Sequence, residues 1–226
     1  MFQAVESPPF FTAMNNETIT TVYFVRHGQT AANAGSIMQG HTDVPLDETG
    51  LKQADVIAQR LKDFPFDVIY SSDLSRALVT AEKIAGNRPV IVTEQLREWN
   101  LGHWQGKSLD EIRTLYHEEH QIYLADDPEF TVVDGESSRE FAERAANFMQ
   151  EIANKHAGKK ILCVSHGGFL TKVFKYALKV ESLPRRPRIF NTAFCCFATR
   201  DNGKTWQLVF WNDASHLPNG GLDNIG

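Results

Sequence analysis

Apolar and β-branched residues gather into short continuous runs along the chain, and segments of helical periodicity separate these runs. The runs occupy residues 20–26, 66–71, 89–92 and 160–165. Continuous apolar character is typical of strands that are buried on both faces, as in a parallel sheet. Asp47 is placed to cap the helix that follows the first run, and residues 137–156 predict a long helix before the last run. This alternation predicts a three-layer α/β/α sandwich around a mostly parallel central sheet.

The length of the chain, 226 residues, suits one domain with a sizeable buried core. We expect residues 1–226 to form this single domain, with residues 1–19 as an N-terminal extension. Residues 107–135 include a stretch rich in Glu, His and Tyr, which predicts a small helical insertion and a candidate lid. Near the end of the chain, two apolar runs flank Asp201-Asn202-Gly203, which predicts an antiparallel hairpin.

Charge and cysteine content narrow the classes of partner. A formal net charge of −5 argues against binding of nucleic acid or of an anionic membrane, because both depend on clustered Lys and Arg. The chain has no apolar stretch of membrane-spanning length and no signal-peptide pattern at its start. Cys163, Cys195 and Cys196 are too few for a disulfide framework, so we expect reduced thiols in a cytoplasmic protein. The partners that remain are a small metabolite and a second copy of the chain in a homodimer.

Two of the predicted strands are followed directly by a histidine. Arg26-His27-Gly28 ends the first apolar run, with a glycine that could let the backbone approach a ligand, and His166 ends the last run. The carboxyl ends of parallel strands meet at one edge of the sheet, so the two imidazoles can face each other. Arg76 lies in the first turn of the helix after the second run, where free N–H groups also favour an anion. One such triplet alone is typical of an ordinary strand end, but the combination predicts an anion site.

The residue types at this edge suit a phosphate dianion. Guanidinium groups bind phosphate oxygens in a bidentate manner, and a protonated His166 would be a further donor. Phosphoryl transfer develops negative charge on the equatorial oxygens, so preorganised positive donors supply most of the catalysis. His27 can accept a phosphoryl group if its attacking nitrogen is unprotonated and its other nitrogen donates to a backbone carbonyl. These residues therefore predict phosphoryl transfer from a small phosphorylated metabolite.

Further motifs follow in order along the chain. They are Arg26-His27-Gly28-Gln29-Thr30 with Asn33, Gln39-Gly40 and Asp43-Val44-Pro45-Leu46; Ser71-Ser72-Asp73-Leu74 with Arg76-Ala77; Leu96-Arg97-Glu98 with Gly102 and Trp104; Gly135-Glu136-Ser137; Val164-Ser165-His166-Gly167-Gly168; and Asn212-Asp213 with His216-Leu217. Together they cover roughly residues 22–217. In these motifs the sequence resembles branch 1 of the histidine phosphatase superfamily, the phosphoglycerate mutase-like family.

The resemblance implies a phosphatase that hydrolyses small phosphate monoesters through a phosphohistidine intermediate, with no metal and no other cofactor. It makes His27 the nucleophile and Glu98 the group that protonates the leaving oxygen; without the family pattern, Glu98 is an ordinary loop carboxylate. The residues expected to hold the phosphoryl oxygens are Arg26, Arg76 and His166. Further residues expected at the phosphate are Thr30, Asn33, Gln39, Gly40 and Gly167.

The nearest alternative is a cofactor-dependent phosphoglycerate mutase. Such mutases carry a pair of arginines in the insertion, whereas here the stretch from Leu109 to Phe130 has one basic side chain, Arg113, among several carboxylates. An aromatic pocket would favour monophosphates whose remainder carries little charge, and hydrolysis is therefore favoured over isomerisation. The aromatic residues expected to line it are Trp99, Trp104, Tyr116 and Tyr123.

Other readings of single motifs are weaker. Ser165 lies in a partial nucleophile elbow, with His216 as a conceivable base, but a serine hydrolase would leave His27 without a role. In the acid phosphatase branch an aspartate follows the second histidine, whereas here the next residue is a glycine. The segment His117–His120 lacks the spacing of a zinc motif and predicts a solvated helix face, and Glu136 is expected to cap the long helix. A binding module without activity is disfavoured because the residues needed for the chemistry are present.

Overall fold

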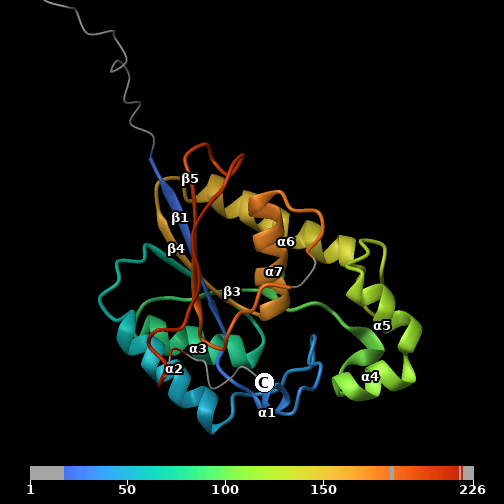
Figure 1. Ribbon diagram of the computed structural model, residues 1–226. Coiled ribbons are helices and arrows are strands. Elements are labelled where there is room, and N and C mark those ends of the chain that lie inside the picture. Colours follow the sequence, from blue (N-terminus) through green and yellow to red (C-terminus); the bar gives the residue numbers. More distant parts are fainter. Residues whose placement is uncertain (1–17, 184–185, 219, 221–226) are drawn as a thin grey trace, which may run out of the picture.

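The computed structural model of the protein describes residues 18–183, 186–218 and 220 (Figure 1). The extension predicted for residues 1–19 lies almost wholly outside this part of the chain. The strands are β1 (Thr20–Arg26), β2 (Val68–Ser72), β3 (Ile91–Thr93), β4 (Lys160–Ser165), β5 (Phe194–Thr199) and β6 (Gln207–Asp213). The helices are α1 (Ala31–Ala34), α2 (Glu48–Arg60), α3 (Ser75–Ala85), α4 (Leu109–Leu115), α5 (His117–Leu124), α6 (Ser138–Lys155) and α7 (Gly167–Leu178), with 3-10 turns η1 (Glu94–Leu96) and η2 (Gly102–Trp104). Among the described helices, none combines the length and the apolar character that a membrane span requires.

The strands form one sheet in the order β3-β2-β4-β1-β5-β6. β1 and β2 both pair with β4 in the parallel sense, and β3 pairs with β2 in the same sense. β5 runs antiparallel to β1, and β6 runs antiparallel to β5. The predicted mostly parallel sheet is confirmed, and the two strands at the centre, β1 and β4, are the two that are followed directly by a histidine.

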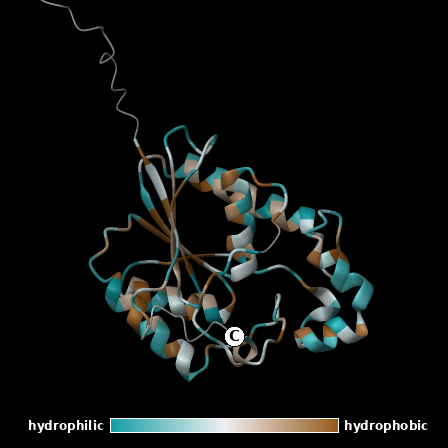
Figure 2. Cartoon of the chain, in the orientation of Figure 1, coloured by the Kyte–Doolittle hydropathy of each residue, from teal (hydrophilic) through white to brown (hydrophobic). Residues whose placement is uncertain are grey.

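Alternate residues of the central strands face two separate cores. In β4, Ile161 and Cys163 pack with residues of α6 and α7, whereas Leu162 and Val164 belong to the core that includes residues of α2 and α3. Burial of such apolar faces on both sides is the main favourable contribution to the stability of the fold. Figure 2 shows the central strands largely in brown and the helices in mixed colours. The expected α/β/α sandwich is therefore confirmed.

The sequence pattern predicted the hairpin correctly but overestimated the burial of the third apolar run. β3 was expected to be buried, but Ile91 is 43% and Val92 is 47% exposed. The reason is that β3 is an edge strand, which pairs with β2 alone. The hairpin of β5 and β6 is confirmed, and Asn202 and Gly203 in its turn both have positive φ, at 56° and 86°.

The predicted insertion forms the short helices α4 and α5, which lie beyond α6 and away from the sheet in Figure 1. The helix α6 is capped by Ser137, whose hydroxyl accepts from the N–H of Glu140 in a capping box. The expectation that Glu136 caps this helix is wrong, because its carboxylate instead accepts from the N–H of Asn100 at 2.8 Å and pairs with Arg144. Movement of the insertion as a lid remains a prediction.

The three cysteines are free and buried. Burial raises the pKa of the Cys163 thiol well above its ordinary value, and raises the pKa of Cys195 and of Cys196 to about 12. Such thiols stay protonated and behave as small apolar side chains.

Candidate active site

The register of the two central strands brings the two histidines together. Arg26 at the end of β1 is paired with Ser165 at the end of β4, so His27 and His166 follow at adjacent positions of the sheet edge. Their ring centroids lie 5.1 Å apart, and both side chains are buried. The expectation that the strand-end imidazoles face each other is confirmed.

One ring nitrogen of His27 is held by the backbone. His27 Nδ1 lies 2.7 Å from the carbonyl oxygen of Gly28, to which it donates when the proton is on Nδ1. This tautomer leaves a lone pair on Nε2. Burial lowers the pKa of His27 well below its ordinary value, and the charges of Arg26 and Arg76 lower it further. Nε2 is therefore available as a nucleophile at neutral pH.

His166 is buried without any hydrogen-bond partner among the described residues. Neither of its ring nitrogens has one, although both are inaccessible to solvent. Burial, and then the positive charge of Arg76, lowers the pKa of His166 well below its ordinary value. We expected a protonated His166 as a further donor. With its pKa lowered, the ring is neutral and offers one N–H donor. Buried polar groups are rarely left unpaired, so a neighbouring ligand is the natural partner.

Two arginines bring positive charge to the same place. Arg76 in α3 is 1% exposed and donates to the carbonyls of Gly40 and Thr42 at 2.8 and 2.9 Å. Arg26 donates to the carbonyl of Ile189 at 2.7 Å. The Nε atoms of both arginines are buried and have no partner in the described part of the chain. Burial lowers both pKa values, that of Arg76 to about 10. Arginine side chains stay protonated in proteins, so both guanidinium groups bring positive charge to the site.

Gly28 allows close packing behind His27. A β-carbon at this position would lie 2.5 Å from the carbonyl oxygen of Gly50 in the first turn of α2. The N–H of Gly28 also donates to Thr80 Oγ1 at 3.2 Å. The expected reason for this glycine was approach of a ligand, but the crowding that we observe comes from α2.

Glu98 is held at the N-terminus of α7. Its carboxylate accepts from the N–H of Gly168 and from that of Trp99, each at 2.9 Å. A β-carbon at Gly168 would lie 2.2 Å from Glu98 Oε1, so only glycine permits this approach. Gly167, the first residue of α7, lines the cleft beside Glu98. The loop carboxylate and the helix N-terminus are thus assembled at the predicted site.

The segment between β1 and α2 contributes three of the remaining predicted residues to the cleft, Asn33, Gln39 and Gly40. Thr30 lies behind them. Its hydroxyl caps α1 by accepting from the N–H of Asn33 at 3.1 Å and also contacts Gln39. Thr30 is fully buried and does not line the cleft, so its geometry is that of a supporting residue.

The cleft has a volume of about 270 Å³. We call the part lined by Arg26, His27 and Arg76 the phosphate end, and the part lined by Trp99, Tyr123 and Arg186 the outer part. Of the four aromatic residues expected there, Trp99 and Tyr123 do line it. The expectation for Trp104 and Tyr116 is wrong. Trp104 is fully buried beneath the cleft, and Tyr116 packs against the ring of His103.

The segment His117–His120 is also less solvated than expected. Glu119 is partly buried and accepts from Trp104 Nε1 at 3.0 Å, which fastens α5 to the body of the protein. In the residues that the structure describes, no cluster of three or more His, Cys, Asp or Glu side chains could hold a metal ion.

The sequence did not indicate two residues of the site. Asn191 donates from Nδ2 to the carbonyl of His27 at 2.9 Å and so fixes the backbone of the histidine. Arg186 lines the outer cleft from the segment after α7. Its only local signal was a basic run interrupted by prolines, Arg185-Arg186-Pro187-Arg188, in which position 185 lies outside the described residues.

The serine hydrolase alternative lacks its geometry. Ser165 is fully buried, and its hydroxyl donates to the carbonyl of Leu96 at 2.7 Å. His216 lies within hydrogen-bond distance of Thr192 and of Arg60. Ser165 and His216 therefore have other partners and form no nucleophile–base pair.

Comparison with known proteins identifies the family. Phosphoglycerate mutase-like protein 4 of Arabidopsis thaliana is 35% identical over 91% of this chain and 90% of its own length. A metal-independent phosphoserine phosphatase of the same plant is 33% identical over 90% of this chain and 86% of its own. The crystal structure of a phosphoserine phosphatase from Entamoeba histolytica, in complex with 3-phosphoglyceric acid, superposes with a TM-score of 0.80 at 29% identity. That match covers 88% of this chain and all of the other. Residues 22–214 match the profile of the histidine phosphatase superfamily, and the chain belongs to branch 1 of that superfamily.

Proposed function

We propose that this protein hydrolyses small phosphate monoesters and that His27 is the residue that becomes phosphorylated. The chain belongs to a superfamily that works through a phosphohistidine, and phosphoserine phosphatases are among its relatives. One observation carries the assignment to His27. A neutral imidazole whose Nδ1 is held by Gly28 lies beside Arg26, Arg76 and His166, which have buried nitrogens without partners in the described residues.

In the first step, His27 Nε2 attacks phosphorus as the bond to the ester oxygen breaks. The phosphoryl oxygens are held by Arg26, Arg76 and His166, whose N–H groups are already in place and need little reorganisation. Glu98 gives its proton to the leaving oxygen, so the alcohol departs neutral. Asn33, Gln39, Gly40 and the N–H of Gly167 complete the wall around the phosphoryl group, and Thr30 supports that wall.

In the second step, water attacks the phosphohistidine. Glu98, now a carboxylate, takes a proton from the water as the N–P bond breaks, which restores the neutral imidazole and the protonated acid. The N–H groups of Gly168 and Trp99 hold the carboxylate in one place during both steps. One side chain can therefore act first as acid and then as base.

A mutase would use the same phosphohistidine but return the phosphoryl group to a second oxygen of the substrate. The name of the first relative above keeps this alternative open. The basic pair that mutases carry in the insertion has no counterpart here, because Arg113 is exposed and pairs with Asp110. Hydrolysis is therefore our assignment, in a cytosolic protein, which the three free thiols support.

A substrate screen tests the proposal. The purified protein should release inorganic phosphate from several small phosphate monoesters, with phosphoserine and 3-phosphoglycerate among the first to be tried. The same reactions should be analysed for interconversion of 2- and 3-phosphoglycerate. Release of phosphate without isomerisation supports hydrolysis, whereas isomerisation faster than release establishes the mutase.

A further inference from the structure

The outer part of the cleft carries one cation that the phosphate chemistry does not use. Three arginines line the cleft among the described residues. The charges of Arg26 and Arg76 act on both histidines, whereas that of Arg186 contributes to the lowered pKa of neither. The acidic side chain in this lining is Glu98, which backbone N–H groups already hold. Arg186 pairs with no carboxylate among the described residues. Its charge is therefore free to meet a charge on the ligand.

Tyr123 fixes the direction of the Arg186 guanidinium. The central carbon of the guanidinium lies 3.8 Å from the centroid of the Tyr123 ring, which is a cation–π stack. One terminal nitrogen donates to the Tyr123 hydroxyl, and the other lies 3.4 Å from the Tyr123 carbonyl oxygen. An arginine has five N–H donors in a planar fork, so most of them remain available. A stacked arginine loses less conformational entropy when it binds an anion.

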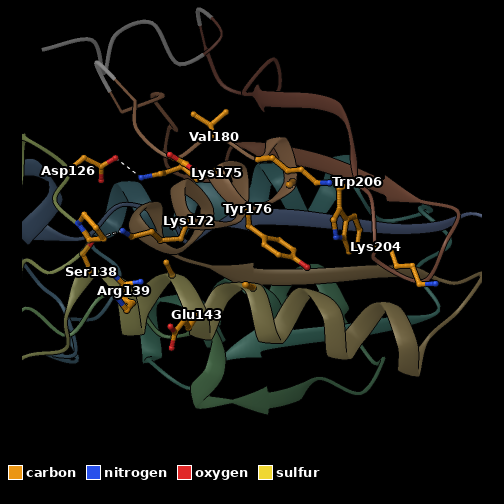
Figure 3. Close-up of a pocket in the computed structure, with 16 residues that line it drawn as sticks. Asp126, Ser138, Arg139, Glu143, Lys172, Lys175, Tyr176, Val180, Lys204 and Trp206 are labelled. Atoms are coloured by element: carbon orange, nitrogen blue, oxygen red, sulfur yellow. Dashed lines mark hydrogen bonds and ion pairs between the residues drawn. The ribbon is translucent and has the colours of Figure 1, made fainter.

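The electrostatic surroundings of Arg186 are positive. A side cavity shares Trp99, Gly168, Thr171 and Arg186 with the cleft, and it is also lined by Lys172, Lys175 and Asp126. Figure 3 shows Lys175 turned to Asp126 and Lys172 turned to Ser138. Lys175 Nζ lies 2.5 Å from Asp126 Oδ2, and Lys172 Nζ lies 2.7 Å from Ser138 Oγ. Asp126 is thus already paired, and with Lys172 protonated the four charged groups sum to +2.

Lys172 belongs to the same group of charges. It is 7% exposed, and its ammonium lies 5.2 Å from the centroid of the Trp99 ring. Burial lowers the pKa of Lys172 to about 8; the charge of Asp126 opposes this lowering, and the charges of Lys175 and Arg186 add to it. The side cavity holds only about 20 Å³, which is room for about one water molecule, so an anion would remain in the cleft on Arg186.

We propose that Arg186 binds a carboxylate on the non-phosphoryl end of the substrate, so that the preferred substrates are small phosphorylated carboxylic acids. The proposal rests on the proposed phosphatase function. A carboxylate matches the guanidinium fork, and it would be flanked by the apolar faces of Trp99 and Tyr123, where an unpaired anion is costly. The cleft, at about 270 Å³, has room for a phosphate with a short acid remainder. The proposal differs from the expectation, made from the sequence, of a substrate whose remainder carries little charge.

Matched ester pairs test the proposal. Phosphoserine and phosphoethanolamine differ only in the carboxylate, and 3-phosphoglycerate and glycerol 3-phosphate differ in the same group. We expect wild-type kcat/KM to be higher for the acid in each pair. In each pair, Arg186→Leu should reduce the ratio of kcat/KM for the acid to kcat/KM for the ester without the carboxylate by about 10- to 100-fold. This equals about 1.4 to 2.8 kcal/mol at 1.4 kcal/mol per factor of ten. Arg186→Lys should retain part of the preference, because it keeps the charge but loses the fork.

Arg188→Leu is the matched control. Arg188 is an exposed arginine two residues further on that does not line the cleft, so its replacement should leave both ratios unchanged. Ratios in Arg186→Leu that equal those of the wild type would overturn the proposal. Wild-type protein that hydrolyses p-nitrophenyl phosphate but none of the four esters would also overturn it, whereas failure on p-nitrophenyl phosphate and on all four esters would contradict the phosphatase proposal itself. Turnover of phosphoethanolamine by Arg186→Leu shows that the variant is folded.

Discussion

The two ends of the cleft are built in different ways. At the phosphate end, His27 and His166 directly follow the two central strands, and Arg76 is anchored by backbone carbonyls of the loop between α1 and α2. At the outer end, Tyr123 comes from the short helix α5 and Arg186 from the segment after α7. The phosphate end is therefore fixed by the sheet, whereas the outer end is assembled from connecting segments.

The difference separates chemistry from selectivity. Phosphoryl transfer requires donors that do not reorganise, and a buried sheet edge supplies them. Choice among substrates requires only that the outer wall carries suitable groups, and connecting segments can change without disturbing the core. Variants at the phosphate end should therefore affect all substrates, whereas variants at the outer end should change the ratio between substrates.

The largest effect is expected for His27→Ala. Loss of the phosphoryl acceptor should reduce turnover by roughly 10⁴- to 10⁶-fold for every ester, as for removal of a nucleophile in other enzymes. Acid-labile, base-stable phosphate should be found on His27 in wild-type protein quenched during turnover. The exposed His117, which does not line the cleft, provides the control variant His117→Ala. Substantial turnover by His27→Ala would show that His27 is not the nucleophile.

Glu98→Gln should have the next largest effect, and its size should depend on the leaving group. An alkyl phosphate leaves as a strongly basic alkoxide and needs a proton, whereas p-nitrophenolate leaves readily without one. The phosphorylation step should slow by roughly 10²- to 10⁴-fold for the alkyl ester and far less for p-nitrophenyl phosphate. Single-turnover rates are needed because dephosphorylation is common to both esters. Equal losses for the two would show that Glu98 does something other than protonate the leaving group.

The phosphate end should also make stability depend on pH. The pKa values of His27 and His166 are lowered by folding, so below about pH 6.5 the unfolded chain binds protons that the folded protein does not. The free energy of unfolding should fall as the pH drops from about 6.5 toward the folded pKa values, by about 1.4 kcal/mol per pH unit for each histidine. Urea titrations between pH 6.5 and 5 should give a slope that is smaller by that amount in His166→Gln. Arg186→Leu, at the outer end, should keep the wild-type slope, and a common slope for all three proteins would contradict this account.

The smallest effect is expected for removal of metal ions. The positive charge at the phosphate end comes from Arg26 and Arg76, so EDTA should leave the rate of phosphate release unchanged. Loss of activity in EDTA that returns with a divalent ion would mean that the arginines do not stabilise the transition state alone.

Much of the phosphate end could be predicted from the sequence. Continuous apolar runs identified β1 and β4, and a histidine at the end of each is brought to one edge by the parallel arrangement. Arg76 follows from the same rule, because the helix after β2 begins at that edge. The assignment of Glu98 needed the family pattern, since nothing in the nearby sequence indicates that its carboxylate meets the N–H of Gly168, 70 residues away.

The outer end was decided by the tertiary structure. The sequence could not show that Trp104 is buried beneath the cleft while Trp99 lines it, or that Arg186 stacks on Tyr123, 63 residues earlier. Periodicity indicates which face of an element is buried, but it says nothing of how an irregular segment folds back over another. The strand ends were predictable because the sheet repeats one geometry, whereas the outer contacts depend on the one path that each connecting segment takes.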